Sequence, residues 1–227
     1  MILGLFDYSF SFFEMLLAVI LVAFFCIISL GFHELSRGFI AYKQGDLTPK
    51  MSGRLSINPI SHIDPWGFVM CLILGIGWTK PIPINPTNFK KFRSGIAKVS
   101  LAGILSNLIL CVIASFLFVL SLNLLGDSRD VIVVALNYFM VINAFLFIFN
   151  MLPIFPLDGF TFISSFMKSD NRFIQFNYKY SSRILIWALI LDILIELFSG
   201  VRFISYILGT LASWIYLPLC KLWQLLF

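Results

Sequence analysis

Long uncharged apolar stretches alternate with short polar stretches along this sequence. A membrane-spanning helix needs about 20 mostly apolar residues, so the pattern predicts five spanning helices. Four of the stretches carry no Asp, Glu, Lys or Arg, and the fourth along the chain is interrupted by two acids. The predicted spans are residues 15–33, 99–126, 131–157, 184–198 and 203–220.

A sixth apolar run, residues 66–79, is only 14 residues long and contains three glycines. It is too short to span a bilayer, so a re-entrant or interfacial piece is expected there. Residues 51–67 and 77–89 alternate small polar and β-prone residues and hold five prolines. Proline is tolerated only in edge strands and turns. These two segments therefore predict a β-hairpin or small sheet. The expected fold class is an α-helical polytopic membrane protein of about five spans, with this β element between the first and second.

Composition and cysteine usage narrow the class of protein. Of the 227 residues, 60% are hydrophobic and 12% are charged, and this charged fraction is about half that of a soluble domain. This excludes a disordered chain, an ordinary soluble enzyme and a typical nucleic-acid-binding domain. The four cysteines lie singly in apolar stretches, so buried reduced thiols are expected rather than disulfides or a cysteine zinc site. Residues 1–227 are expected to form a single integral membrane domain.

The charges of the polar loops predict an orientation. Residues 37–98 hold nine of the sixteen Lys and Arg residues against two acids, and residues 168–183 hold four bases and one acid. The intervening loop, residues 127–130, holds two acids and one base. Because basic loops face the cytoplasm, the first two segments are expected to be cytoplasmic and the N-terminus to lie outside. No basic region precedes the first apolar stretch, so we expect this stretch to be retained rather than cleaved as a signal peptide.

His33 and Glu34 are adjacent ionisable residues at the end of the first apolar stretch. Ionisable groups at membrane depth are costly and are candidates for a functional site. His-Glu also begins the zinc motif H-E-x-x-H, in which two histidines on one helix face bind zinc and the Glu activates the metal-bound water. The fifth position here is Arg37. Taken alone, such a pair is more often a packed or capping histidine beside a solvated glutamate.

A second polar site follows the third predicted span, in the segment NMLPIFPLDG that runs from Asn150 to Gly159. Pro153 and Pro156 must interrupt the helix. This leaves Asp158 at or near membrane depth, beside a glycine that allows close backbone approach. Asp158 either contributes to a functional site or caps a short helix over residues 160–167.

Together these motifs resemble the site-2 protease family of intramembrane zinc metallopeptidases, in its compact bacterial and archaeal form. The resemblance covers about residues 32–167 and rests on five segments in the family's order. They are HELSRGFIAYKQGD, SGRLSINPISHIDPWG, GWTKPIPINPTNFK, SLAGILSN and NMLPIFPLDG. The resemblance implies a family core over about residues 14–167, to which residues 168–227 add two C-terminal helices.

The resemblance also implies a site. In the family, Zn²⁺ is held by both histidines of the helix motif and by the Asp of L-D-G, and the Glu is the general base. Carried over to this chain, His33 and Asp158 are metal ligands, Glu34 is catalytic, and Asn150 binds the extended backbone of a substrate. Family substrates are transmembrane segments of other proteins, often membrane-tethered regulators. A bacterial inner membrane is the expected location.

Arg37 stands where the resemblance places the third zinc ligand and cannot take that role. A guanidinium stays protonated and offers no lone pair, whereas a catalytic zinc site needs three protein ligands and a water. Zinc is therefore not expected in the usual geometry unless Arg37 swings away, and Arg37 is expected instead to pair with Glu34, Asp158 or both. His62, the only other histidine, is the first substitute ligand to consider, although the resemblance assigns it to the hairpin.

Three functions remain open from the sequence. The first, ranked ahead, is a family member with lost or reduced hydrolysis, a pseudoprotease that binds membrane segments. The second is an active zinc endopeptidase with a substitute ligand. The third is a transporter-like protein using Asp192 and Glu196, which share one helix face at i, i+4 and suggest an ion path. These two acids are otherwise expected to lie on an exposed face or to pair with Arg202 or another base near the membrane surface.

Overall fold

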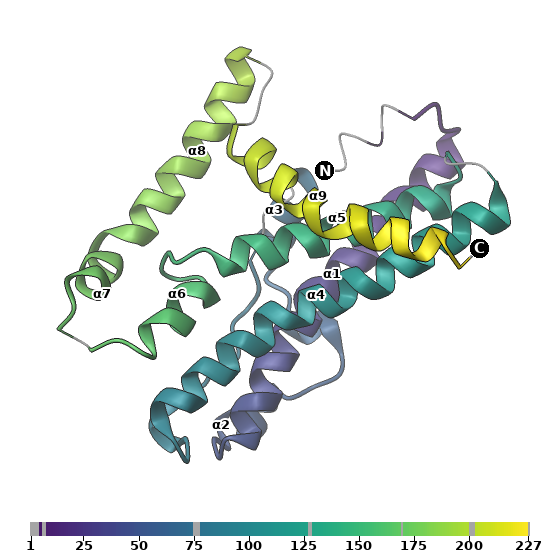
Figure 1. Ribbon diagram of the computed structural model, residues 1–227. Coiled ribbons are helices and arrows are strands. Elements are labelled where there is room, and N and C mark those ends of the chain that lie inside the picture. Colours follow the sequence, from purple (N-terminus) through teal and green to yellow (C-terminus); the bar gives the residue numbers. More distant parts are fainter. Residues whose placement is uncertain are drawn as a thin grey trace.

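Three long helices form the centre of the molecule (Figure 1). The computed structural model describes residue 5 and residues 8–74, 78–126, 129–168, 170–199 and 203–226. The central helices are α1 (Phe12–Lys43), α4 (Phe92–Leu125) and α5 (Val131–Met151). Each packs against the other two, and their apolar core includes the stacked rings of Phe25 and Phe139, whose centroids are 4.4 Å apart.

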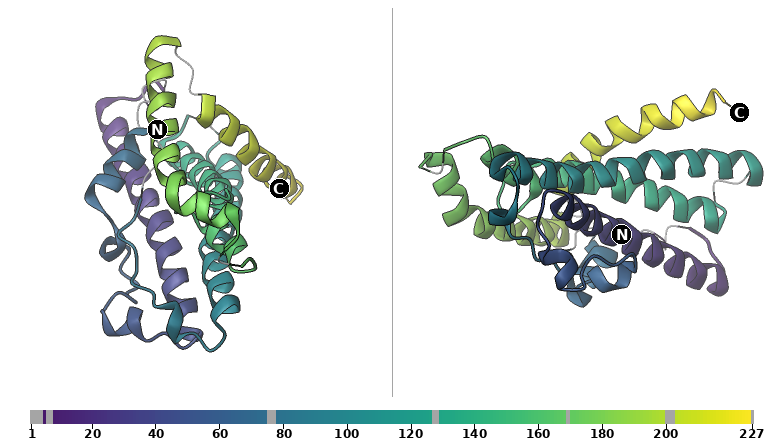
Figure 2. Two further views of the ribbon diagram at one scale, coloured as in Figure 1. Left: turned by 90° about the vertical axis from the view of Figure 1, so that its left-hand side faces the viewer. Right: turned by 90° about the horizontal axis from the view of Figure 1, so that it is seen from below.

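Shorter elements surround this bundle. α9 (Phe203–Gln224) lies against α4 and α5, and α6 (Asp158–Ser164) packs on the same two helices. α8 (Ser182–Ser199) projects away from the bundle and packs chiefly against α9 and the π-helical turn η4 (Figures 1 and 2). The remaining elements are α2 (Thr48–Met51), η2 (Pro59–His62), α3 (Pro65–Leu74), η3 (Pro86–Asn88), α7 (Arg172–Phe176) and η4 (Asn177–Ser181).

The ends of the central helices follow from the local sequence. α1 begins with a capping box, in which Ser11 Oγ accepts a hydrogen bond from Glu14 N and Glu14 Oε2 accepts one from Ser11 N. α4 ends at Gly126, whose φ of 71° glycine adopts without steric cost. α5 ends before Pro153, which has no N–H to continue the helix. This break lets the chain turn back toward α1.

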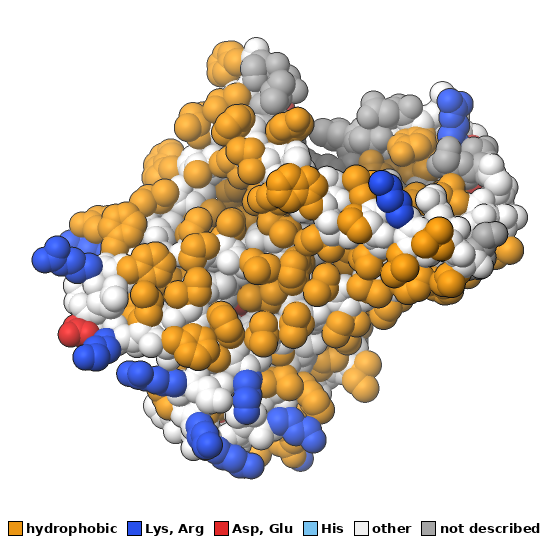
Figure 3. Space-filling view, viewed as in Figure 1, with side chains coloured by type: hydrophobic (Ala, Val, Ile, Leu, Met, Phe, Trp, Pro, Cys, Tyr) orange, Lys and Arg blue, Asp and Glu red, His pale blue; other side chains and the backbone are white. Residues whose placement is uncertain are grey.

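Among the described residues, four helices are long and apolar enough to cross a membrane: α1, α4, α5 and α9. The prediction of five spans was wrong for α8, which is only 18 residues long and carries three charged residues, at positions 183, 192 and 196. The sixth apolar run forms the short helix α3, and residues 75–77 of that run lie outside the described part of the chain. Apolar side chains cover most of the surface seen in Figure 3.

The predicted β-hairpin is absent from the described residues, and this part of the fold class was wrong. Short helical turns and irregular chain take its place, with one isolated antiparallel bridge between Ile63 and Thr79. Three of the five prolines begin helical turns. The other two flank Ile82, whose N–H donates to Glu34 Oε2 at 2.9 Å. A ladder of backbone hydrogen bonds cannot form here for two reasons. The prolines have no N–H to donate, and the N–H of Ile82 between them is already bonded to a side chain.

A buried carboxylate ties this segment to the end of α1. Asp46 is 0% exposed and accepts hydrogen bonds of 2.6–3.1 Å from Thr48 N, Thr48 Oγ1, Asn88 Nδ2 and Asn85 N. Burial raises the pKa of Asp46, but the hydrogen bonds from Thr48, Asn88 and Asn85 lower it by more, so it lies below the ordinary aspartate value. The ionised carboxylate therefore stabilises the folded loop.

Replacing Asp46 with Asn is expected to lower the free energy of unfolding by about 1–3 kcal/mol at neutral pH, because an amide cannot accept all of these hydrogen bonds. Since the folded-state pKa is lowered, the carboxylate stabilises the protein fully above the ordinary pKa of about 3.9. That contribution disappears as the pH falls through the folded-state pKa. The gap in melting temperature between parent and variant, measured in detergent, should therefore narrow on acidification. A gap that stays constant would contradict this role.

Candidate functional site

Four ionisable side chains meet where α1 passes the start of α6. His33, Glu34 and Arg37 belong to α1, and Asp158 is the first residue of α6. His33, Glu34 and Asp158 are 8%, 2% and 4% exposed, and the Arg37 side chain is 25% exposed. The break of α5 at Pro153 brings Asp158 back to α1, so two motifs more than 120 residues apart form one cluster.

Arg37 links the two carboxylates of this cluster. Its NH1 donates to Glu34 Oε1 at 3.0 Å, and its Nε lies 3.3 Å from Asp158 Oδ1. Burial raises the pKa of Asp158, but the charge of Arg37 and the contact with His33 lower it by more, so it lies below the ordinary value. Arg37 therefore occupies the bridging position expected from the sequence, as the cation that two buried carboxylates require.

A relay of buried polar side chains orients His33. His33 Nδ1 lies 2.9 Å from Asn107 Oδ1 of α4, Asn107 Nδ2 donates to Asn143 Oδ1 of α5 at 3.2 Å, and Asn143 Nδ2 donates to Ser29 Oγ at 2.8 Å. Both asparagines and Ser29 are 0% exposed. Because Asn107 uses its amide group as a donor to Asn143, its oxygen accepts from His33, and the ring hydrogen lies on Nδ1. The sequence analysis missed these residues, although polar residues inside uncharged spans are a usable signal.

The orientation of the ring determines what faces Asp158. His33 Nε2 lies 3.2 Å from Asp158 Oδ2, but the approach does not have hydrogen-bond geometry, and Oδ2 has no hydrogen-bond partner among the described residues. A neutral ring with its hydrogen on Nδ1 would turn the Nε2 lone pair toward the carboxylate. A proton on Nε2 removes that repulsion and leaves two cations beside two carboxylates. The geometry therefore favours a protonated His33.

Gly103 of α4 closes one side of the cluster. A Cβ at this position would press on Asp158 Oδ2 and would lie 2.9 Å from both Arg37 Cδ and His33 Cε1. Real Cβ atoms do not approach other atoms so closely. Because Gly103 has no side chain, α1 and α6 can both lie close to α4 at the cluster.

Glu34 is engaged through both carboxylate oxygens. Oε1 accepts from Arg37 and Oε2 accepts from Ile82 N. A general base must direct a lone pair at the proton that it removes. In this arrangement Glu34 fixes Arg37 and the loop that carries Ile82, which is 5% exposed, and two of its four lone-pair sites are already used.

The donor set is incomplete for a catalytic zinc ion. Two ligands at tetrahedral zinc, each about 2.05 Å away, lie about 3.3 Å apart, which is close to the 3.2 Å between His33 Nε2 and Asp158 Oδ2. Beside them lies Arg37, which has no lone pair to donate. The described residues contain no group of three His, Cys, Asp or Glu side chains that could hold a metal ion. The residues present therefore do not fit a resident catalytic zinc site.

The other residues singled out from the sequence make separate contacts. The Asn150 amide donates to Leu146 O at 3.0 Å, and its role in substrate binding stays a prediction. His62 is fully buried, with Nε2 2.9 Å from a backbone carbonyl oxygen, and it forms no metal-capable group within the described chain. All four cysteines are free, and three of them are buried.

Asp192 caps a helix. It is 4% exposed, and its carboxylate accepts hydrogen bonds from Ile204 N at 2.7 Å, Ser205 N at 3.4 Å and Ser205 Oγ at 3.3 Å. These N–H groups belong to the first turn of α9, where a helix leaves its own donors unsatisfied and favours a negative charge. Arg202 lies outside the described residues, and Glu196 has an interaction partner. One of the two acids on which the transporter hypothesis rested thus has a structural role.

Comparison with known proteins gives one informative relative. Over 141 residues the chain is 43% identical to a protein of Bacillus subtilis (strain 168) named "Putative zinc metalloprotease YwhC". The alignment covers 60% of this chain and 64% of that protein, so the chain spans less than two thirds of the relative's length. No family model matches the sequence, and no solved structure matches it. The similarity agrees with the resemblance to zinc metallopeptidases. Zinc is part of the name of the relative.

Replacing Arg37 with Ala is expected to lower the free energy of unfolding by about 3 kcal/mol or more, because two buried carboxylates lose their shared cation. Melting temperature in detergent measures the effect. The matched control is Arg93→Ala, since Arg93 is exposed on α4 and should change stability by less than about 0.5 kcal/mol. Equal melting temperatures for the Arg37 variant and the parent would refute the bridging role.

Replacing Asp192 with Ala is expected to lower the stability of the first turn of α9 by about 1–2 kcal/mol, because its N–H groups lose their acceptor. Hydrogen exchange at Ile204 and Ser205 should become faster by roughly tenfold. Exchange in the first turn of α5, capped by Asp130, serves as the internal control and should not change. Unaltered protection of α9 would show that the cap is dispensable.

Proposed function

We propose that this protein is a membrane-embedded relative of the site-2 proteases that binds transmembrane segments of other proteins and has lost most or all hydrolysis. The observation that carries the proposal is the position of Arg37, in contact with the carboxylates of both Glu34 and Asp158. In the family that the motifs resemble, the fifth residue of H-E-x-x-H is a zinc ligand. An arginine there brings a permanent charge where that chemistry needs a lone pair.

Two further observations support a membrane protein of this family. The relative from Bacillus subtilis is named as a zinc metalloprotease and is 43% identical over the aligned region. Four described helices are long and apolar enough to cross a bilayer, and three of them, α1, α4 and α5, surround the cluster or its relay. The bacterial inner membrane, with the N-terminus outside, remains the predicted setting.

The chemistry of the cluster favours binding over cleavage. Peptide hydrolysis by this class of site needs an electrophile that polarises the carbonyl and a base that activates water. Here the base, Glu34, is hydrogen-bonded through both oxygens, and the predicted ligand Asp158 is paired with Arg37 and His33. A segment held near Asn150, as the resemblance implies, would meet no activated water. The chain would then retain or present membrane segments.

The other two hypotheses gain no support from the structure. An active zinc endopeptidase needs a third donor near His33 and Asp158, and no suitable group occurs in the described part of the chain. His62 is held in η2 by its own hydrogen bond. The transporter hypothesis loses Asp192, which caps α9.

Metal content tests the proposal directly. The parent protein, purified without chelators and measured by plasma mass spectrometry, is expected to carry far less than one zinc per chain. Arg37→His is expected to bind about one zinc, because it adds the third ligand to a pair of atoms already spaced for tetrahedral coordination.

Two controls separate a genuine site from surface-bound metal. Zinc in Arg37→His should vanish when Asp158 is also changed to Ala, and should persist when the exposed Asp170 is changed instead. Cleavage of transmembrane peptides by the parent should not exceed that of Glu34→Gln and should not respond to chelators. About one zinc in the parent, or chelator-sensitive cleavage by it, would refute the proposal.

A further inference from the structure

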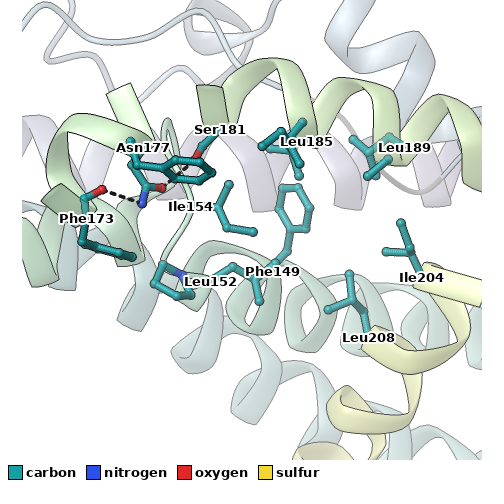
Figure 4. A pocket seen from close by; sticks show the side chains of 14 residues that line it. Phe149, Leu152, Ile154, Phe173, Asn177, Ser181, Leu185, Leu189, Ile204 and Leu208 are labelled. Carbon is teal, nitrogen blue, oxygen red and sulfur yellow. Dashed lines mark hydrogen bonds between the residues drawn. The ribbon is translucent and has the colours of Figure 1, made fainter. Parts of the chain in front are cut away.

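An apolar groove of about 410 Å³ lies between α8 and the ends of α5 and α9 (Figure 4). Leu185 and Leu189 of α8 line one side, and Phe149 of α5 and Leu208 of α9 line the other. Both α5 and α9 are long and apolar enough to cross a membrane. Two further lining residues, at positions 176 and 184, are 52% and 53% exposed, so the groove is accessible from outside the protein.

The polar atoms at one end of the groove are satisfied within the protein. Asn177 Oδ1 accepts hydrogen bonds from Ser181 Oγ at 2.8 Å and from Phe155 N at 3.2 Å, and Asn177 Nδ2 donates to Phe173 O at 3.1 Å. A bound water needs two to four polar partners, which this lining no longer offers. The groove therefore favours an apolar occupant.

The dimensions of the groove favour a hydrocarbon chain over a partner helix. A helix about 10 Å across fills roughly 420 Å³ in a single turn, so the groove would hold only about one turn. Its lining extends from Ser181, the last residue of η4, to Leu189 of α8, about 12 Å at 1.5 Å per residue. A narrow apolar space of this length suits an extended acyl chain, whose burial is favourable in proportion to its apolar area.

Basic side chains gather at the polar end of the groove. Three basic residues of this segment are exposed: Arg172 and Arg183 each precede a lining residue in the sequence, and Lys179 lies in η4 between two lining residues. Asp170 is the nearby exposed acid. Lys179 Nζ lies 5.0 Å over the ring of Tyr180. Figure 3 shows Lys and Arg side chains at the end of the molecule where α7 lies, next to a broad apolar surface. This is the pattern expected where a protein meets the phosphates of a bilayer surface.

We propose that the groove binds one acyl chain of an anionic phospholipid, with the lipid phosphate held by Lys179 and Arg183. The apolar lining takes the chain, and the excess of basic side chains selects the headgroup. The bound lipid would fill the space between α8 and the ends of α5 and α9, since α8 otherwise packs chiefly on α9 and η4. This inference does not depend on the state of the cluster around Arg37.

Native mass spectrometry of the full chain in detergent tests the proposal with phosphatidylglycerol and phosphatidylcholine of identical acyl chains. The parent is expected to retain about fivefold more phosphatidylglycerol. Ala188→Trp fills the groove and should lower this retention about tenfold, whereas Ile186→Trp, at a position that is 55% exposed on α8, should not. Changing both Lys179 and Arg183 to Gln should abolish the preference between the two lipids.

Equal retention of the two lipids by the parent would overturn the proposal. So would equal retention of phosphatidylglycerol by Ala188→Trp and Ile186→Trp. If the melting temperature shows that Ala188→Trp does not fold, the comparison of both lipids on the parent and the charge variant still decides the question. The parent could also carry a co-purifying protein segment and no bound lipid. If Ala188→Trp displaces that segment, the proposal is overturned in favour of a partner helix.

Discussion

Burying a carboxylate in an apolar helix bundle is costly unless a cation neutralises it, and this protein buries two at one point. Glu34 comes from α1 and Asp158 from the start of α6. Arg37 touches both, and the geometry favours a second positive charge on His33. Other features of the fold have to be compatible with this neutral cluster. They are the break in α5, the close approach of α4 and the loop at Ile82.

The same cluster explains why the site combines features of a metal centre with features that oppose one. The nitrogen of His33 and the oxygen of Asp158 have the separation of two tetrahedral ligands. The asparagine relay fixes the orientation of the histidine ring through Nδ1, as a hydrogen-bond acceptor behind a metal-binding histidine does. Yet the arginine already neutralises the carboxylates that would otherwise attract a dication. With Arg37 in place, the cation beside the two carboxylates is the guanidinium, and the described residues offer no third donor for a metal ion.

Some of this arrangement could be predicted from the sequence and some could not. The residue pair at 33–34 and the Asp after a double-proline break each had an ordinary structural explanation, and only the resemblance to the site-2 proteases joined His33, Glu34 and Asp158 in one predicted site. The structure brings these three side chains together around Arg37. The partners Asn107 and Asn143 were missed because the spans were identified by the absence of charged residues, and a neutral amide does not interrupt such a stretch. Which helix faces meet depends on packing between segments far apart in the sequence.

The errors in the fold have physical causes of the same kind. Alternating polar and β-prone residues predicted a hairpin between the first two spans, but the prolines remove donors and the N–H groups of Ile82 and Asn85 bond to Glu34 and Asp46 instead. Side chains on α1 and just beyond its end thus replaced a neighbouring strand as the acceptor. α8 was predicted to span because its apolar content is high, although three charged residues interrupt it. Tertiary partners thus decided the first case, and the charge content of the helix decided the second.

The bare backbone at Gly103 also has an evolutionary consequence. Any side chain at that position displaces groups on α1 and α6 at the same time, so a tolerated change there requires coordinated changes elsewhere. Position 37 is different, because its side chain is partly exposed and two of the six arginine codons become histidine codons by a single base change. A lineage that carries this scaffold and one of those two codons is therefore a single nucleotide from a histidine at position 37, while the glycine preserves the space beside that position.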